Sequence, residues 1–328
     1  HLHVGEYPTI RRDGLITRLD SQKLTDEDLN FICMALAPDN IRDDIHNMQD
    51  IDFSYEIPGC SRFRVNISRQ MGNFAVAIRV VPYKTRTLKE LNLPESMYDF
   101  GKLENGIVLL TGPTGSGKST TMAAMLDDIN EKYQKHIITI EDPVEHVFQN
   151  KKSIISQRQL LIDTPTFADG IKYAMRQDPD VILVGEIRDR ETITTALRAA
   201  ETGHLVFSTI HTNNAIETVN RIINMFNPVD RPLVRYQLGH VLRGTISQKL
   251  LPTSSGMGRV PAVEILVSTP TVQDLIIKNE LDKIYDLVRN GSYDNMITLN
   301  TSLFNMVQKG IITQEIALGA SNNINELR

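Results

Sequence analysis

The chain has few cysteines, no long apolar run and no excess of positive charge, and each absence excludes a class of protein. Its 328 residues include two cysteines, Cys33 and Cys60. Two are too few for a disulfide framework or a four-cysteine zinc site, so we expect both to be buried thiols. No stretch approaches the roughly 18 apolar residues of a membrane span, and no basic-then-apolar signal segment opens the chain. We therefore expect a cytoplasmic protein.

The charge balance is slightly acidic. Charged residues make up 23% of the chain, and the formal net charge is −5. Such a composition does not attract polyanions, so nucleic acid is not the expected partner. The length favours two domains, because single cores usually stop growing at roughly 250 to 300 residues.

The first part of the chain, residues 1–82, has an α+β pattern. Thr25 and Asp28 have the spacing of a capping box at the start of a helix. Apolar and polar side chains alternate in three predicted strands, 51–57, 61–68 and 74–81. Residues 83–94 contain several basic residues, end in a proline and are interpreted as a linker.

From residue 95 onward, short apolar strands alternate with helices, which predicts an α/β domain over 95–328. The strands are expected at 107–111, 137–140, 181–184 and 205–210. They are nearly all apolar, as is typical of a parallel sheet covered on both faces. After about residue 250 the strand signal weakens, and helices beginning near Pro270 and Thr298 predict a helical C-terminal region.

The most specific motif follows the strand 107–111 directly. Residues Gly112 to Ser119 read Gly-Pro-Thr-Gly-Ser-Gly-Lys-Ser and fit the phosphate-loop pattern G-x-x-x-x-G-K-[ST]. The glycines let backbone N–H groups surround an anion, Lys118 can reach the outer phosphates, and the Ser119 hydroxyl can ligate Mg²⁺. The alternative is a glycine-rich turn with a chance lysine. The motif predicts a nucleoside triphosphate site.

Acidic residues follow two other strands of the same predicted sheet. Glu141, Asp142 and Glu145 come after 137–140, and Glu186 comes after 181–184. Ligands bind at the carboxyl ends of strands in open α/β sheets. Hydrolysis needs one carboxylate to orient the attacking water and others to fix Mg²⁺ or the loop, and Glu186 has the position of a Walker B acid. The alternatives are a solvated acidic turn and a plain strand-end glutamate.

Two histidines flank the strand 205–210. His211 emerges at the same end as Glu186 and Lys118, where it could sense the γ-phosphate or link the site to a neighbouring subunit. A structural histidine is the alternative. His204 precedes the strand beside Gly203, so capping the carbonyls of a helix end is an equally good interpretation.

Arginines are concentrated on two neighbouring strands of the first domain, at Arg62, Arg64, Arg69 and Arg79. Alternation puts Arg62 and Arg64 on one face of the sheet, away from Phe63. They are either solvated charges or arginine fingers supplied across an interface, an effect worth roughly 10³ to 10⁵ in rate. The second interpretation implies an oligomer.

Four segments, taken in order, resemble the boxes of the secretion-ATPase superfamily: Gly112–Thr120, Ile140–Glu145, Asp178–Asp189 and Thr202–Asn213. Within this superfamily the chain is most similar to the motors that retract type IV pili. The likeness extends from Arg62 through the segment 296–320. It implies a PAS-like N-terminal domain, a RecA-like ATPase domain and a homo-hexameric ring with ATP between subunits.

The resemblance also assigns roles to the residues of each box. Glu145 would be the water-activating base, Glu186 the Walker B acid that reaches Mg²⁺, and the first-domain arginines Arg62, Arg64 and Arg79 would act on the neighbouring subunit's site. The Walker A residues, which would bind ATP, are Gly112, Pro113, Thr114, Gly115, Ser116, Gly117, Lys118, Ser119 and Thr120. The Asp box would comprise Glu141, Asp142 and Glu145, with metal contacts from Ser119, Glu141 and Asp142, and the His box His204 and His211.

The resemblance further implies a ring that works peripherally at the inner face of the cell membrane against a pilus platform protein. Relatives that extend pili typically carry a four-cysteine zinc motif, which two cysteines cannot form, so retraction is favoured over extension. The alternatives are another secretion-superfamily ATPase for pilus extension or type II/IV secretion, a nucleic-acid translocase, and a nucleotide-gated assembly protein with little turnover.

Overall fold

The computed structural model describes residues 1–12, 15–58, 60–81, 85–291 and 294–327. The chain divides into two compact units, His1–Lys84 and Thr85–Arg328. Leu88 and Leu93 are buried in the core of the second unit. The stretch from Thr85 to Pro94, which was interpreted as part of a linker over 83–94, therefore belongs to that unit; residues 83 and 84 lie outside the described part.

The first unit is α+β, as predicted. Its elements are β1 (Leu2–His3), β2 (Thr9–Arg12), β3 (Leu15–Arg18), α1 (Asp26–Leu36), α2 (Asp39–Arg42), β4 (Asp50–Ile57), β5 (Ser61–Gln70) and β6 (Asn73–Val81). Strands β1, β6, β5 and β4 form an antiparallel sheet in that order, and β2 pairs with β3. The predicted capping box is confirmed, since the Thr25 hydroxyl accepts from the Asp28 amide and the Asp28 carboxylate accepts from the Thr25 amide.

The core of the first unit lies between α1 and the sheet. Leu29 and Cys33 of α1 are buried in one cluster with Val65 of β5 and Val76 of β6. The expected burial of Cys33 is confirmed. The expectation was wrong for Cys60, which is exposed in the turn between β4 and β5, because such connections run over the protein surface.

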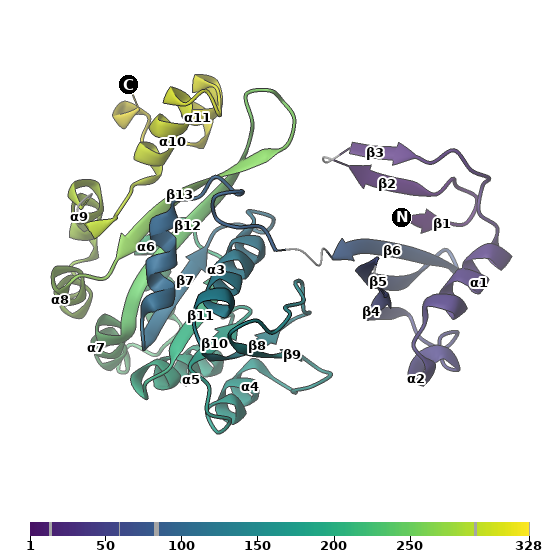
Figure 1. Ribbon diagram of the computed structural model, residues 1–328, viewed down its shortest axis with the longest axis horizontal. Helices are drawn as coiled ribbons and strands as arrows, with labels where there is room; N and C mark the ends of the chain where they lie inside the picture. Colours follow the sequence, from purple (N-terminus) through teal and green to yellow (C-terminus); the bar gives the residue numbers. More distant parts are fainter. Residues whose placement is uncertain (13–14, 59, 82–84, 292–293, 328) are drawn as a thin grey trace. The chain divides into compact units, whose positions relative to one another are not determined.

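The second unit is built around a seven-stranded sheet (Figure 1). Its elements are η1 (Glu95–Lys102), β7 (Gly106–Thr111), α3 (Lys118–Lys132), β8 (His136–Glu141), β9 (Ile154–Gln159), α4 (Phe167–Ala174), β10 (Val181–Val184), α5 (Arg190–Glu201), β11 (Leu205–Ile210), α6 (Ala215–Asn224), α7 (Arg231–Val241), β12 (Leu242–Pro252), β13 (Arg259–Val267), α8 (Pro270–Lys278), η2 (Leu281–Lys283), α9 (Ile284–Asn290), α10 (Leu299–Gln308), α11 (Gln314–Ala320) and η4 (Ile324–Glu326).

The strand order in this sheet is β13-β12-β7-β11-β10-β8-β9. All neighbours are parallel except β13, which runs antiparallel to β12. The four predicted strands are confirmed as β7, β8, β10 and β11, and they occupy the middle of the sheet. The carboxyl ends of these strands meet at one edge, where the phosphate loop begins.

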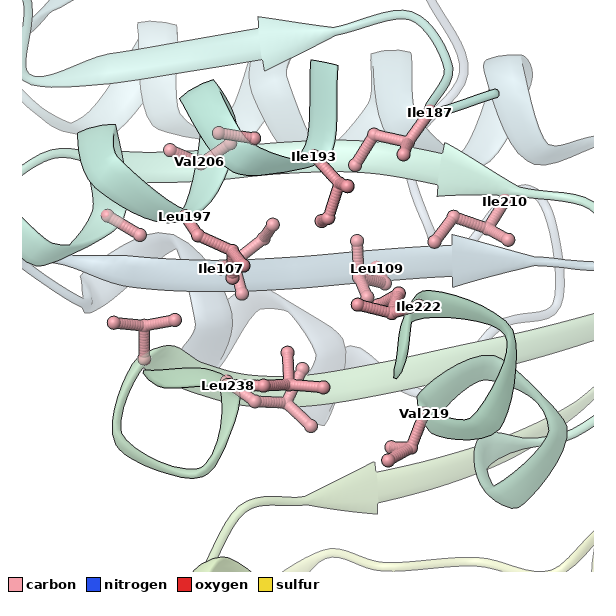
Figure 2. Close-up of a cluster of buried hydrophobic side chains, with 14 of the residues drawn as sticks. Ile107, Leu109, Ile187, Ile193, Leu197, Val206, Ile210, Val219, Ile222 and Leu238 are labelled. Atoms are coloured by element: carbon pink, nitrogen blue, oxygen red, sulfur yellow. The ribbon is translucent and has the colours of Figure 1, made fainter. Parts of the chain in front are cut away.

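Hydrophobic side chains cover both faces of the sheet. On one face, a cluster joins the strands to α5, α6 and α7, and Figure 2 shows its members Ile107, Leu109, Ile193, Leu197, Val206, Val219, Ile222 and Leu238. On the other face, Met125 and Ile129 of α3 pack with Met97 and Phe100 of η1. The central strands are apolar throughout because both of their faces are buried.

The weakening strand signal after residue 250 was misleading. Strands β12 and β13 form a long antiparallel pair, seen in green in Figure 1, that continues the sheet beyond β7. Polar residues such as Thr245, Gln248 and Glu264 interrupt the apolar pattern of these strands, yet their side chains are buried. The helical region behind them is confirmed, with α8 beginning at Pro270 and α10 capped by Thr298.

Within the described ranges, no helix combines the length and the apolar character needed to cross a lipid bilayer.

Candidate functional site

The phosphate loop connects β7 to α3 and has a backbone that only glycine adopts easily. Gly112, Gly115 and Gly117 have φ angles of +143°, +78° and +87°. A Cβ on Gly112 would lie 2.3 Å from the carbonyl oxygen of Gln248, and one on Gly117 would lie 2.9 Å from the Gln248 side-chain nitrogen. The glycines that the motif requires are therefore fixed both by conformation and by close packing.

The start of α3 is suited to an anion. Its N-cap residue is Gly117, and no side chain caps the helix. The amides of the first turn therefore remain available for a phosphate at the positive end of the helix dipole. The Ser116 hydroxyl is buried and has no hydrogen-bond partner among the described residues, while Ser119 is exposed on the first turn. This arrangement fits a bound polyphosphate.

Lys118 lies folded over the loop. Its Nζ donates to the carbonyl oxygens of Gly112 at 2.8 Å and of Pro113 at 3.0 Å. Burial lowers the pKa of Lys118, and the negative charges of Glu186 and Glu145 act in the opposite direction. The predicted lysine and two of the predicted carboxylates thus share one electrostatic neighbourhood.

Glu186 follows β10 and is held from two sides. The Arg188 guanidinium forms an ion pair with its Oε1, and His211 Nε2 lies 3.4 Å from its Oε2. The Glu186 side chain is only 13% exposed, whereas that of His211 is 48% exposed. The backbone supports this placement, since the Gly185 amide donates to the Ile140 carbonyl oxygen at 2.8 Å. The structure therefore brings the predicted Walker B acid and His211 together.

The three acidic residues after β8 differ in their surroundings. Glu141 is buried, and its carboxylate accepts from the Thr139 hydroxyl at 2.7 Å, from Gln157 Nε2 at 3.2 Å and from the Glu145 amide at 3.4 Å. Burial raises the pKa of Glu141, and these hydrogen bonds oppose the shift. These three protein donors hold the Glu141 side chain within its own loop, and the metal contact that the resemblance implied stays a prediction.

Asp142 is exposed, and Glu145 is half-buried. The charge of Glu145 acts on Lys118. Among the residues that the structure describes, no three histidine, cysteine or acidic side chains gather as a metal cluster. The donors that could contact a magnesium ion together with phosphate oxygens are the Ser119 hydroxyl and the Glu186 carboxylate.

His204 lies away from this site. It stands at the amino end of β11, and its Nδ1 is 3.0 Å from the Ala199 carbonyl oxygen near the end of α5. His211 is at the other end of the same strand, which at roughly 3.3 Å per residue is about 20 Å away. Within one subunit, His204 therefore serves the helix end, the alternative that its neighbour Gly203 suggested.

The predicted arginines belong to the first unit. Arg64 of β5 lies opposite Arg79 of β6 in the strand register, and Arg64 Nε is 3.6 Å from Asp52 Oδ1. Arg69 lies on the other face, donates to the His46 carbonyl oxygen and stacks over the Phe74 ring. Arg62, Arg64 and Arg79 thus share the face opposite the core, and their action on a phosphate loop stays a prediction.

Two residues of the site were not assigned from the sequence. Arg188, which pairs with Glu186, lies inside the predicted Walker B box, so that box was the signal that could have found it. Gln248 of β12 is buried against the phosphate loop, where its Nε2 donates to the Ser116 carbonyl oxygen at 2.6 Å. No spacing rule points to Gln248, because it is far from the loop in sequence and lies on an unpredicted strand.

The parallel sheet, the phosphate loop behind its central strand and the acid behind a neighbouring strand define a P-loop protein with a RecA-like core. The profile of the family described as Type II/IV secretion system protein matches residues 47–318. The chain belongs to this family, and with it to the secretion ATPases.

Two curated relatives match nearly the whole chain. The Type IV pilus retractation ATPase PilT of Pseudomonas aeruginosa is 42% identical over 317 residues, covering 97% of this chain and 92% of the relative. The Twitching motility protein of Neisseria gonorrhoeae is 43% identical over 316 residues, covering 96% and 84%.

A solved structure agrees with these relatives. The crystal structure of the pilus retraction motor PilT with bound ADP has a TM-score of 0.92 at 44% identity, covering 99% of this chain and 93% of that one. The predicted family and the predicted fold, a RecA-like ATPase domain preceded by an α+β domain, are confirmed.

Proposed function

We propose that this chain hydrolyses ATP in the presence of Mg²⁺ and uses the energy to retract a type IV pilus. One combined observation carries the proposal. Lys118, Glu186 and His211 meet at one edge of the sheet, in a chain that is 42% identical to a pilus retraction ATPase over 97% of its length.

The residues of the site divide the chemistry among them. The glycine-rich loop and the first turn of α3 bind the phosphates, and Lys118 neutralises the outer ones once its Nζ leaves the loop carbonyls. Glu145 lies close enough to Lys118 to interact with it electrostatically. We assign Glu145 the role of the base that activates the attacking water. Glu186, oriented by Arg188 and His211, faces the same region. The Ser119 hydroxyl and the Glu186 carboxylate would hold a magnesium ion. Its charge would neutralise negative charge on the β- and γ-phosphates.

The proposed working form is a homo-hexameric ring at the inner face of the membrane, which acts on a pilus platform protein. Arg62, Arg64 and Arg79 would then reach the phosphates bound by the adjacent subunit. Mixing Arg64→Ala subunits with Lys118→Ala subunits tests this idea. Each variant alone should be inactive, and the mixture should recover part of the ATP turnover; mixed rings without any recovery would contradict action across the interface.

Retraction and extension predict opposite phenotypes in the native host. A strain whose only copy carries Lys118→Ala should accumulate surface pili that no longer retract, because assembly continues without the retraction motor. Lys172→Ala is a matched control, since Lys172 is exposed on α4, and it should retract normally. Loss of surface pili in the Lys118→Ala strain would contradict retraction and favour an extension ATPase.

A further inference from the structure

Gln248 makes a double contact with the nucleotide-binding loop from a strand that belongs to neither the loop nor its helix. Its side-chain Nε2 donates to the Ser116 carbonyl oxygen at 2.6 Å. Its Oε1 accepts from the hydroxyl of Thr121, in the first turn of α3, at 2.9 Å. Gln248 is only 2% exposed, so no water competes for these two bonds. One amide therefore ties the end of the loop to the start of the helix.

The backbone of Gln248 also contacts the other end of the loop. The space beside Gly112 is closed by the Gln248 carbonyl oxygen, and the space beside Gly117 is closed by the Gln248 side-chain nitrogen. The loop is thus packed against this residue at both of its ends. Its three positive-φ glycines allow many other backbone shapes, so packing from outside the loop must select one of them.

We propose that Gln248 is a positioning residue that holds the phosphate loop in its nucleotide-binding shape. The inference rests on the proposed nucleotide chemistry, since a loop shape matters only if the loop binds phosphate. A glutamine is required because the position needs a donor for Ser116 and an acceptor for Thr121 at the same time. Methionine of similar length has no donor and only a weakly accepting sulfur.

Loss of the amide should be visible as weaker binding. If the loop of the free variant adopts the competent shape only about one tenth of the time, the apparent Kd for nucleotide rises about tenfold. Saturating nucleotide selects the competent shape again, so kcat should change far less than KM. A residue that only supported the fold would instead lower the melting temperature and the active fraction, and leave Kd unchanged.

The test compares Gln248→Met with the parent in the full chain, with a fluorescent ADP for Kd and phosphate release for KM and kcat. Thr245→Val is the matched control, because Thr245 lies on the same strand, is fully buried and has a hydroxyl without a partner among the described residues. We expect Gln248→Met to weaken ADP binding about tenfold, about 1.4 kcal/mol. Thr245→Val should bind ADP like the parent.

The outcomes separate this inference from the proposed function. Parent-like ADP binding in Gln248→Met would overturn the positioning role. Lower kcat with unchanged Kd would also overturn it, because that pattern indicates a loss of folded protein. A parent chain that binds no nucleotide would instead refute the proposed function itself.

Discussion

At the scale of single residues, the carboxylates at the carboxyl ends of two neighbouring strands are held in different ways. The Glu186 carboxylate forms an ion pair with the Arg188 guanidinium and lies beside the His211 ring. Glu141 is surrounded by neutral donors, among them the hydroxyl of Thr139 and the amide of Gln157. A carboxylate with neutral donors in a buried place is costly to ionise, which is why burial raises the pKa of Glu141.

The burial of Glu141 predicts a pH-dependent stability. Its pKa is raised above the ordinary 4.5 in the folded chain, so the folded state binds more protons than the unfolded state above pH 4.5. The contribution of Glu141 to the free energy of unfolding is therefore fully present below pH 4.5 and is lost as the pH rises through the raised pKa. The slope reaches at most about 1.4 kcal/mol per pH unit while only the unfolded state is ionised.

Urea unfolding of the parent and of Glu141→Gln between pH 4.5 and pH 8 measures this contribution. The free energy of unfolding of the parent, relative to the variant, should fall with rising pH and then level off. The difference between the free energies of unfolding of the two proteins cancels the contribution of Glu264, whose raised pKa acts similarly in both. A difference that stays constant across this range would show that Glu141 titrates alike in both states.

Individual residues could be predicted where chemistry demands one residue type at a fixed spacing. Lys118, Gly112 and Gly117 follow from the motif, and Glu186 follows from an apolar strand that ends in an acid. The two faces of the arginine strands also follow from alternation. Gln248 could not be predicted, since a glutamine suits any surface position and its contact with the loop exists only in the folded chain.

At the scale of elements, the β12–β13 pair supports the site from the side. Gln248 of β12 contacts the phosphate loop, and the next residue, Lys249, donates to the carbonyl oxygen of Ala320 at 3.0 Å. Glu264 of β13 accepts from the Ala215 amide, the first residue of α6, at 2.9 Å. Because α6 begins four residues after His211, this carboxylate fixes the segment that carries the histidine.

Replacing Glu264 should therefore destabilise the start of α6. Glu264→Ala leaves a buried amide without a partner and should lower the free energy of unfolding by about 1 to 3 kcal/mol. Glu264→Gln keeps an acceptor without a charge and should cost less. Chemical denaturation of the full chain compares both with Asp274→Ala, which removes an exposed carboxylate paired with Lys278. Equal stability of Glu264→Ala and the parent would contradict this role.

The predicted elements succeeded where the hydrophobic pattern is simple. The central strands are apolar because both faces are buried, and that signal is strong in sequence. Strands β12 and β13 were missed because their inward side chains include Thr245, Gln248 and Glu264, whose burial depends on hydrogen bonds to distant segments or on tight packing. Local patterns do not contain that information.

At the scale of the whole molecule, the length favoured two domains, and the alternation of apolar strands with helices indicated the α/β core; the structure has two compact units and that core. Composition did not indicate the function of the chain. The proposed function rests on the four boxes and on the match to pilus retraction ATPases. The central claim remains chemical: this site hydrolyses ATP.

Steady-state phosphate release by the purified chain with saturating ATP and Mg²⁺ tests this claim most directly. The parent and Glu191→Gln, a control for an exposed acid in the first turn of α5, should both turn over ATP. Glu186→Gln should bind ATP but release phosphate about a hundredfold more slowly or worse, because the carboxylate facing the reacting phosphate has lost its charge. Equal turnover in Glu186→Gln and the parent, or no turnover in the parent, would contradict the account.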